Sequence, residues 1–177
     1  MTFDTTNKTR THLPGFQALA FWTNKAIWPS KTLQIIKSLN FLNNILAKTE
    51  ALSRDAHEAI MLNYQGFVTE GSISNIFFVK DGIVATPSVK TGILDGITRR
   101  TIFYCAQEKN FPITQGFYTT EDLYEADEIF LSNTTMEIMP VSQIDGRDVK
   151  RCPGPCTKAL HYQYKRHVDD YIRKNAR

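Results

Sequence analysis

The feature of this sequence that most constrains its fold is a pair of apolar runs joined by a two-residue turn. Residues 75–80 and 83–86 are rich in β-branched and aromatic side chains, and Asp81-Gly82 stands between them. Aspartate followed by glycine tolerates the positive φ angles of a type I′ turn, which joins adjacent antiparallel strands. Pro87 cannot donate to a strand ladder and therefore predicts the end of the second strand. The centre of the chain is expected to form antiparallel sheet.

Other strands and helices are predicted on both sides of this hairpin. Alternating or continuous apolar runs predict strands over 17–22, 33–38, 58–63, 67–70, 128–132 and 138–144. Helical spacing of apolar residues predicts helices over 40–54, over 97–109 with Asp95 as N-cap, over 120–126 capped by Thr120, and over 155–173. The fold class is therefore expected to be α+β, with an antiparallel-rich sheet and helices packed outside it.

Composition excludes several classes of protein. The chain has 177 residues, 42% apolar and 22% charged, which is typical of one globular domain. No apolar run approaches the ~20 residues of a membrane helix, and the first residues lack the apolar core of a secretion signal. Three cysteines, an odd number, indicate a reducing compartment, so a cytoplasmic location is expected. The basic tail is interrupted by Asp169 and Asp170, which favours a solvated helix end over a nucleic-acid surface.

The cysteines and histidines do not form a convincing site. Cys152 and Cys156 flank Pro-Gly-Pro, and this loop could be read as a metal or redox site or as an ordinary surface loop. No second Cys/His pair occurs at ligand spacing, so the surface loop is favoured and no metal is expected. The four histidines, His12, His57, His161 and His167, are isolated from one another, and no catalytic role is assigned to them.

Three polar groups follow one another over about sixty residues. Lys37 lies among Ile35, Ile36 and Leu39, an apolar setting in which its amine could be neutral often enough to attack an aldehyde. The alternative is a lysine at a strand end whose ammonium reaches solvent. Glu70 follows a strand, and a carboxylate there could keep a pyridine nitrogen protonated; the alternative is a surface glutamate.

The third group is the turn Gly96-Ile97-Thr98, which opens a predicted helix. Free N–H groups and the positive end of the helix favour a phosphate, and the Thr98 hydroxyl adds a donor. The polar turn 132–135 could complete such a site and reach a substrate carboxylate, or could simply join two strands. Asn75 is expected to satisfy backbone groups in the loop after Glu70. An aldehyde, a pyridine ring and a phosphate occur together in pyridoxal 5′-phosphate, which is the predicted cofactor.

In these motifs and in their order, the sequence resembles the class IV aminotransferases. These fold-type IV pyridoxal-phosphate enzymes include D-amino-acid aminotransferase, branched-chain aminotransferase and the related aminodeoxychorismate lyase. The resemblance extends from about residue 33 to the last helix. The segments that carry it are Lys37 to Asn40, Leu46-Ala47, Glu50-Ala51, Glu70-Gly71, Ala85-Thr86-Pro87, Gly96-Ile97-Thr98-Arg99, Ala126-Asp127-Glu128 and Glu137 to Val141.

The resemblance implies a fold, a reaction and a set of site residues. The fold would be the C-terminal cofactor domain of fold-type IV enzymes, a sheet or pseudo-barrel with flanking helices. The reaction would move an amino group from an amino acid to a 2-oxo acid in a homodimer. Lys37 would be the catalytic Schiff-base lysine and would move the proton between the substrate Cα and the cofactor C4′. Glu70 would hold the pyridine nitrogen. The phosphate would be bound by Ile97, Thr98 and Thr134, and Thr135 would lie near the substrate carboxylate.

Two departures from the family pattern, together with the Glu70-Gly71 pair, indicate which member of the family the chain resembles. Phe41 stands where branched-chain aminotransferases carry a tyrosine, which favours a D-amino-acid-aminotransferase-like member. The Glu70-Gly71 pair favours an aminotransferase over the lyase, which remains an alternative. Only 36 residues precede Lys37, where the family places a smaller lobe of ~100 residues. Residues 1–32 are therefore read as a lead-in or remnant of that lobe and 33–177 as the cofactor domain, with a truncated, non-catalytic remnant as the other alternative.

Overall fold

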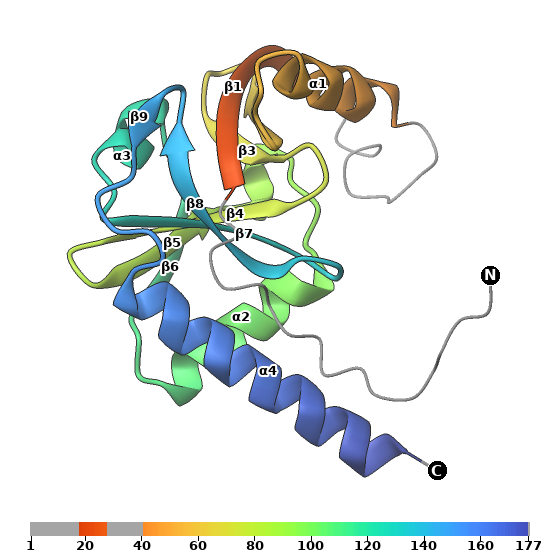
Figure 1. Ribbon diagram of the computed structural model, residues 1–177, viewed down its shortest axis with the longest axis vertical. Helices are drawn as coiled ribbons and strands as arrows, with labels where there is room; N and C mark the ends of the chain where they lie inside the picture. Colours follow the sequence, from red (N-terminus) through yellow and green to blue (C-terminus); the bar gives the residue numbers. More distant parts are fainter. Residues whose placement is uncertain (1–17, 28–40, 177) are drawn as a thin grey trace.

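The computed structural model describes residues 18–27 and 41–176, and between 18 and 27 it describes the side chains of Ala18 and Ala20 only. A single mixed sheet organises this part of the chain (Figure 1). Its strands are β1 (Ala18–Ile27), β2 (Glu58–Asn63), β3 (Val68–Gly71), β4 (Asn75–Lys80), β5 (Ile83–Pro87), β6 (Ile113–Gly116), β7 (Glu128–Asn133), β8 (Glu137–Ile144) and β9 (Arg147–Asp148). The helices are α1 (Leu42–Leu52), the short 3-10 helix η1 (Val89–Thr91), α2 (Ile97–Glu108), α3 (Thr120–Tyr124) and α4 (Pro155–Asn175).

The strands follow the order β3-β2-β1-β8-β7-β4-β5-β6, and β9 pairs with β8. β1 is parallel to both β2 and β8, and β5 is parallel to β6, while the other described pairs are antiparallel. The hairpin β4–β5 turns at Asp81 (φ +50°) and Gly82 (φ +76°), as the Asp-Gly pair predicts. The α+β class and the antiparallel-rich sheet are confirmed.

The sheet curls until its two ends approach each other. The Val68 N–H of β3 donates to the Tyr118 carbonyl, just beyond β6, at 2.7 Å. The rings of Phe67 and Phe117 meet edge to face beside this bond, with centroids 5.3 Å apart. Inside the curl, one buried cluster collects side chains from seven strands, including Ile60, Phe78, Leu131 and Val141. This arrangement agrees with the expected pseudo-barrel.

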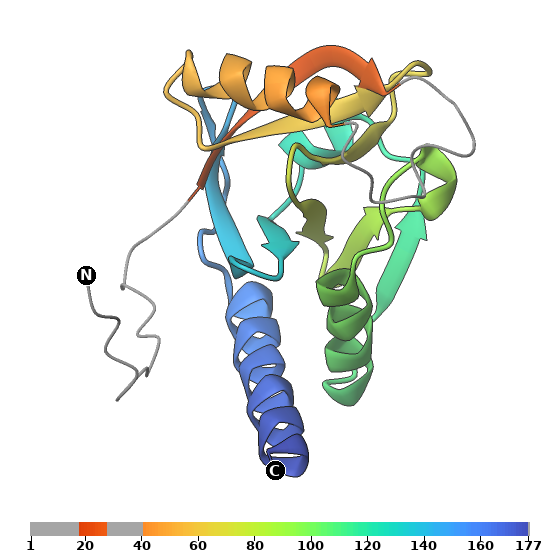
Figure 2. The same ribbon diagram turned by 90° about the vertical axis from the view of Figure 1, so that its right-hand side faces the viewer.

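Helices cover the outside of the curl. α2 and α4 lie side by side against β7 and β8, the green and blue helices in Figures 1 and 2. A second buried cluster fills the space between these helices and the sheet, where Phe77 stacks on Phe130 at 5.0 Å and Ile102 and Leu160 cover them. α1 packs through small side chains, among them Ala47 and Ala51, onto β2. No helix in the described ranges is long and apolar enough to cross a membrane.

Some predicted boundaries and caps were wrong. The N-cap of α2 is Gly96, not Asp95, whose carboxylate binds Arg99 instead. The N-cap of α3 is Thr119, one residue before Thr120, and both its N–H and its hydroxyl lie within hydrogen-bond distance of the Asp122 carboxylate. β6, η1 and β9 were not predicted; β6 is a mostly exposed strand and therefore lacks an apolar pattern.

Two expectations concern the N-terminal part of the chain. The strand predicted over 33–38 lies outside the described residues. The strand predicted over 17–22 exists and extends to Ile27 as β1, which is inserted between β2 and β8. β1 therefore belongs to the sheet, although it falls in the segment 1–32 that the sequence assigned to a lead-in or remnant. The boundary at residue 33 stays a prediction.

A buried carboxylate fixes the start of α4. Glu128 on β7 accepts hydrogen bonds from the backbone N–H groups of Cys156 (3.0 Å) and Thr157 (2.7 Å) and from the Thr157 hydroxyl (2.6 Å). A negative group at a helix N-terminus satisfies donors that have no partner within the helix. The N-cap Gly154 has no side chain because a Cβ would overlap the Glu128 carboxyl group. Glu128 therefore ties α4 to the sheet.

Replacing Glu128 with glutamine is expected to lower the free energy of unfolding by about 2 kcal/mol, because the amide nitrogen would face N–H donors in a buried position. Urea unfolding followed by circular dichroism measures the change. Glu108→Gln, at the exposed end of α2, is the matched control and should leave stability within about 0.5 kcal/mol. Equal effects of the two substitutions would contradict the role of Glu128.

Candidate functional site

The loop between β3 and β4 is held by a second buried carboxylate. Glu58 on β2 accepts from the Ser72 N–H (3.0 Å), from the Ser72 hydroxyl and from the Ser74 hydroxyl (2.9 Å). Gly71 lies so close to these groups that a Cβ would overlap the Ser74 hydroxyl and crowd Glu58. The sequence Gly-Ser-Ile-Ser therefore folds into one fixed loop directly after Glu70.

Glu70, near the end of β3, is a partly buried carboxyl group with few partners. Its Oε2 accepts from the Leu94 N–H at 3.0 Å and from Asn75 Nδ2 at 3.3 Å. Burial raises the pKa of Glu70 to about 8, the charge of Glu58 adds to this rise, and the Leu94 hydrogen bond and the charge of Arg99 oppose it. Without a cation beside it, Glu70 is therefore mostly protonated at neutral pH.

Asn75 joins the segments around Glu70. Its Nδ2 donates to the Leu94 carbonyl at 2.9 Å and to Glu70. A Cβ on Gly96 would come within 2.5 Å of the Asn75 Oδ1, so only glycine permits this approach. The backbone of Asn75 pairs with that of Ser132 on β7. Asn75 satisfies a backbone group, as expected, but the group belongs to the segment before α2 and not to its own loop.

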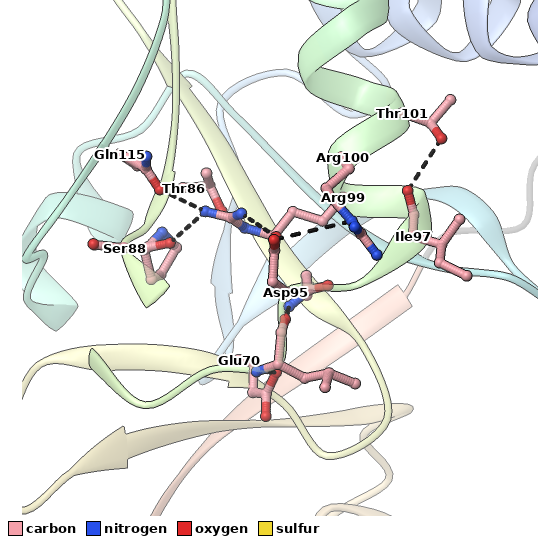
Figure 3. A network of polar contacts seen from close by, with 12 residues as sticks. Glu70, Thr86, Ser88, Asp95, Ile97, Arg99, Arg100, Thr101 and Gln115 are labelled. Atoms are coloured by element: carbon pink, nitrogen blue, oxygen red, sulfur yellow. Dashed lines mark hydrogen bonds and ion pairs between the residues drawn. The ribbon is translucent and has the colours of Figure 1, made fainter. Parts of the chain in front are cut away.

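The N-terminus of α2 begins beside these residues. Gly96 provides no side-chain cap, and no acidic residue lies in the first turn. The first N–H groups of a helix have no partner within it, so this end is electropositive and open to an acceptor. Ile97 is exposed, whereas Thr98 is only 3% exposed and its hydroxyl has no partner in the described residues. Figure 3 shows Ile97 at the start of the helix, beside Asp95.

Arg99 anchors the same turn from the inside (Figure 3). Its Nη1 binds the Asp95 carboxylate at 2.7 Å, and its Nη2 donates to the Pro87 carbonyl (3.1 Å) and the Gln115 side chain (3.0 Å). The guanidinium also lies over the Phe103 ring at 5.0 Å. A 3% exposed arginine thus connects α2 to the ends of β5 and β6.

The turn between β7 and β8 carries Thr134 and Thr135, both exposed. Asn133 shapes the turn, because its Oδ1 accepts from the N–H groups of Thr135 (2.9 Å) and Met136 (2.7 Å). The Asn133 Nδ2 donates to the Ile73 carbonyl at 3.1 Å, which ties this turn to the loop after Glu70. Just before the turn, the Ser132 hydroxyl is buried and has no partner in the described residues.

Glu137 follows the same turn in a left-handed conformation (φ +59°), which is uncommon for a residue with a side chain. Its Oε2 lies 3.2 Å from the His161 Nε2 and 3.6 Å from the Lys165 Nζ, both on α4. Contacts with α4 therefore support the backbone at the end of the turn.

The structure brings together part of the predicted set of site residues. Glu70 and the Ile97-Thr98 turn are joined through Leu94, Asn75 and Gly96, and the Thr134-Thr135 turn is tied to the loop after Glu70. Lys37 lies outside the described residues. Sequence reasoning included Ser132 only as part of the polar turn 132–135 and gave no role to Arg99, which directly follows Thr98, a weak signal.

The cysteine segment offers no sign of a reactive site. Cys152 lies in the turn before α4, whereas Cys156 is buried in its first turn and so is not part of an exposed loop. Burial and the nearby charge of Glu128 raise the pKa of both thiols to about 11, which disfavours the reactive thiolate. Within residues 18–27 and 41–176, no three His, Cys, Asp or Glu side chains gather to hold a metal ion.

Glu70 makes the stability of the chain depend on pH. Its pKa is about 8 in the folded chain against an ordinary value of 4.5, so the folded chain holds a proton that the unfolded chain releases between these values. The associated stability is complete below about pH 4.5 and is lost as the pH rises through 8. Glu70→Gln cannot ionise, so its stability relative to the unaltered chain should increase from pH 5 to pH 8.

Urea unfolding at several pH values, without added ligand, tests this expectation. Glu108→Gln serves as the control and should run parallel to the unaltered chain across the range. A constant difference between Glu70→Gln and the unaltered chain would show that Glu70 ionises normally in the folded state.

Known proteins resemble this chain closely. A family model described as amino-transferase class IV matches residues 2–144. The putative branched-chain-amino-acid aminotransferase of Methanocaldococcus jannaschii is 44% identical over 131 residues, which cover 73% of this chain and 46% of that protein. The D-alanine aminotransferase of Listeria monocytogenes is 46% identical over 132 residues, which cover 73% of this chain and 45% of that protein.

Solved structures of branched-chain aminotransferases also match this chain. The branched-chain aminotransferase of Thermobaculum terrenum in its PLP form has a TM-score of 0.84 and 34% identity, over 88% of this chain and 52% of that chain. The enzyme of Thermoproteus uzoniensis with norvaline has a TM-score of 0.83 and 38% identity, over 89% and 54%. This chain spans about half the length of the curated relatives it matches. By its sequence and its fold, it belongs to the class IV aminotransferase family.

Proposed function

We propose that this chain binds pyridoxal 5′-phosphate and transfers an amino group from an amino acid to a 2-oxo acid. The observation that carries the proposal is the continuous link from Glu70 through Leu94 to the uncapped start of α2. It joins a carboxyl group to an electropositive helix end, and these are the kinds of group that bind a ring nitrogen and a phosphate. The relatives named above support the reaction class.

Unsatisfied groups in the structure fit the phosphate. The buried hydroxyls of Thr98 and Ser132 have no partner in the described residues, and such groups are costly unless an acceptor reaches them. We assign phosphate binding to the N–H of Ile97, the hydroxyl of Thr98 and the exposed Thr134. Thr135 is proposed to meet the substrate carboxylate.

Glu70 is proposed to hold the pyridine nitrogen in its protonated form. Burial raises the pKa of Glu70 to about 8 when no cation is near it. A pyridinium beside the carboxyl group acts in the opposite direction and favours its ionised form, because an adjacent opposite charge stabilises the carboxylate. When bound, the cofactor supplies an electron sink for the charge left on the substrate Cα after its proton is removed.

Lys37 is proposed as the catalytic residue. Its amine would hold the cofactor aldehyde as a Schiff base and would then carry the proton between the substrate Cα and the cofactor C4′. The assignment rests on its sequence, Lys-Ser-Leu-Asn before α1, and on its place inside the matched range 2–144.

The proposal includes a homodimer in the cytoplasm. Several apolar side chains of α1 are exposed in the single chain, including Leu42, Ile45 and Leu46, and an apolar helix face of this kind is typical of a protein interface. Three cysteines fit a reducing compartment. Analytical ultracentrifugation of the purified chain tests the dimer.

Lys37→Ala is expected to abolish amino transfer and the visible absorbance band that forms when pyridoxal phosphate binds. Lys90→Ala, which removes an exposed lysine, is the control and should retain both. D- and L-amino acids are offered separately, and pyruvate release from aminodeoxychorismate tests the lyase alternative. An active Lys37→Ala protein would overturn the role of Lys37. Binding without transfer would favour a cofactor-binding part that does not turn over by itself.

Thr98→Val is expected to have opposite effects on stability and on binding. Replacing a buried, unpartnered hydroxyl with a methyl group should leave the cofactor-free chain equally or more stable. The same change removes a phosphate donor and should weaken pyridoxal phosphate about tenfold. Thermal unfolding and a binding titration measure the two effects. Thr101→Val, one turn further along α2, is the control, and equal affinities of Thr98→Val and Thr101→Val would rule out Thr98 as a phosphate ligand.

A further inference from the structure

The sequence predicts Asp95 as the cap of α2, and the structure places its carboxylate elsewhere. Asp95 is the residue before the N-cap Gly96, close enough to the helix start to supply an acceptor for its N–H groups. Its Oδ1 instead binds Arg99 Nη1 at 2.7 Å. The helix start has no side-chain cap.

Arg99 is built to hold Asp95 in this position. The Pro87 carbonyl and the Gln115 side chain, two neutral acceptors, fix its second nitrogen (Figure 3). The Phe103 ring covers its guanidinium. The Arg99 side chain is 4% exposed, while that of Asp95 is 46% exposed, so the rigid partner is the cation. Its Nε has no acceptor in the described residues.

An anionic ligand at the start of α2 would be sensitive to this arrangement. A carboxylate that capped the helix would occupy the N–H groups that a phosphate needs and would repel its charge. The same segment also carries the Leu94 N–H that binds Glu70, so a shift of Asp95 would disturb both ends of the site. The positive charge of Arg99 also acts on Glu70: it lowers the pKa of this carboxyl group, against the effect of burial.

We propose that Arg99 is a positioning residue of the cofactor site, which keeps the Asp95 carboxylate away from the start of α2 and so leaves that start open to the phosphate of the cofactor. This inference rests on the proposed function. It concerns only residues of this chain, and it gives the buried arginine a purpose beyond packing.

A set of five variants tests the proposal. Arg99→Gln releases Asp95, Arg99→Lys keeps the charge without the planar fork, and Asp95→Ala removes the competing acceptor and its charge. The double variant Arg99→Gln/Asp95→Ala combines the first and third changes. Arg100→Gln is the matched control, because Arg100 is the neighbouring residue, is 64% exposed and lies 3.9 Å from the same carboxylate. Each purified chain is titrated with pyridoxal phosphate and separately with inorganic phosphate.

Arg99→Gln is expected to weaken pyridoxal phosphate tenfold or more, Arg99→Lys less, and Arg100→Gln about twofold at most. The double variant should recover most of the lost affinity. Thermal unfolding separates this from a purely structural role, because the double variant cannot restore the buried contacts of Arg99. Affinity should therefore recover while the melting temperature stays low.

Amide hydrogen exchange over residues 94–101 gives a readout that does not require cofactor. Exchange at the start of α2 should slow in Arg99→Gln, where Asp95 caps the helix, and should return in the double variant. Unchanged affinity in Arg99→Gln, or a loss that the double variant does not recover, would overturn the inference and leave the proposed function standing. Failure of the unaltered chain to bind pyridoxal phosphate would overturn the proposed function and the inference with it.

Discussion

The hydrogen bonds of Asn75 connect the parts of the candidate site, and the rest of its geometry depends on them. The side chain of Asn75 donates to the Leu94 carbonyl and to Glu70. Its Oδ1 lies so close to Gly96 that a side chain at that position would overlap it. Its backbone is paired with that of Ser132. A strand residue thus sets the distance between a buried acid and a helix start. Because β4 lies inside the sheet, between β7 and β5, this distance is fixed by the core and not by a mobile loop.

Buried carboxyl groups are used in three different ways in this fold. Glu58 is surrounded by donors of the loop after β3 and holds that loop in one shape. Glu128 meets the donors at the start of α4 and attaches the helix to β7. Glu70 has fewer partners, and burial raises its pKa to about 8. A carboxyl group with few donors is the one suited to receive a cation, and this difference separates the candidate functional acid from the two structural ones.

Much of the fold follows from local signals in the sequence. The strands β2 and β4 and the turn at Asp81-Gly82 were predicted with their observed boundaries, because alternation and turn chemistry act over a few residues. The sequence did not predict β6, because this mostly exposed strand has no apolar pattern of its own. It forms a strand because it pairs with β5. Gln115, which lies within β6, then matters to the site, since it accepts a hydrogen bond from Arg99.

The sequence by itself determined the fold class, the main strands and helices, and the kinds of chemistry available at Glu70, Ile97 and Thr98. Only the tertiary structure decided which groups those residues meet. Asp95 shows the difference, because its position before Gly96 predicts a helix cap, while the buried Arg99, held by Pro87 and Gln115, draws its carboxylate away. Local preference gives each side chain several possible partners of similar energy. The packed core selects one of them by fixing where distant segments of the chain lie.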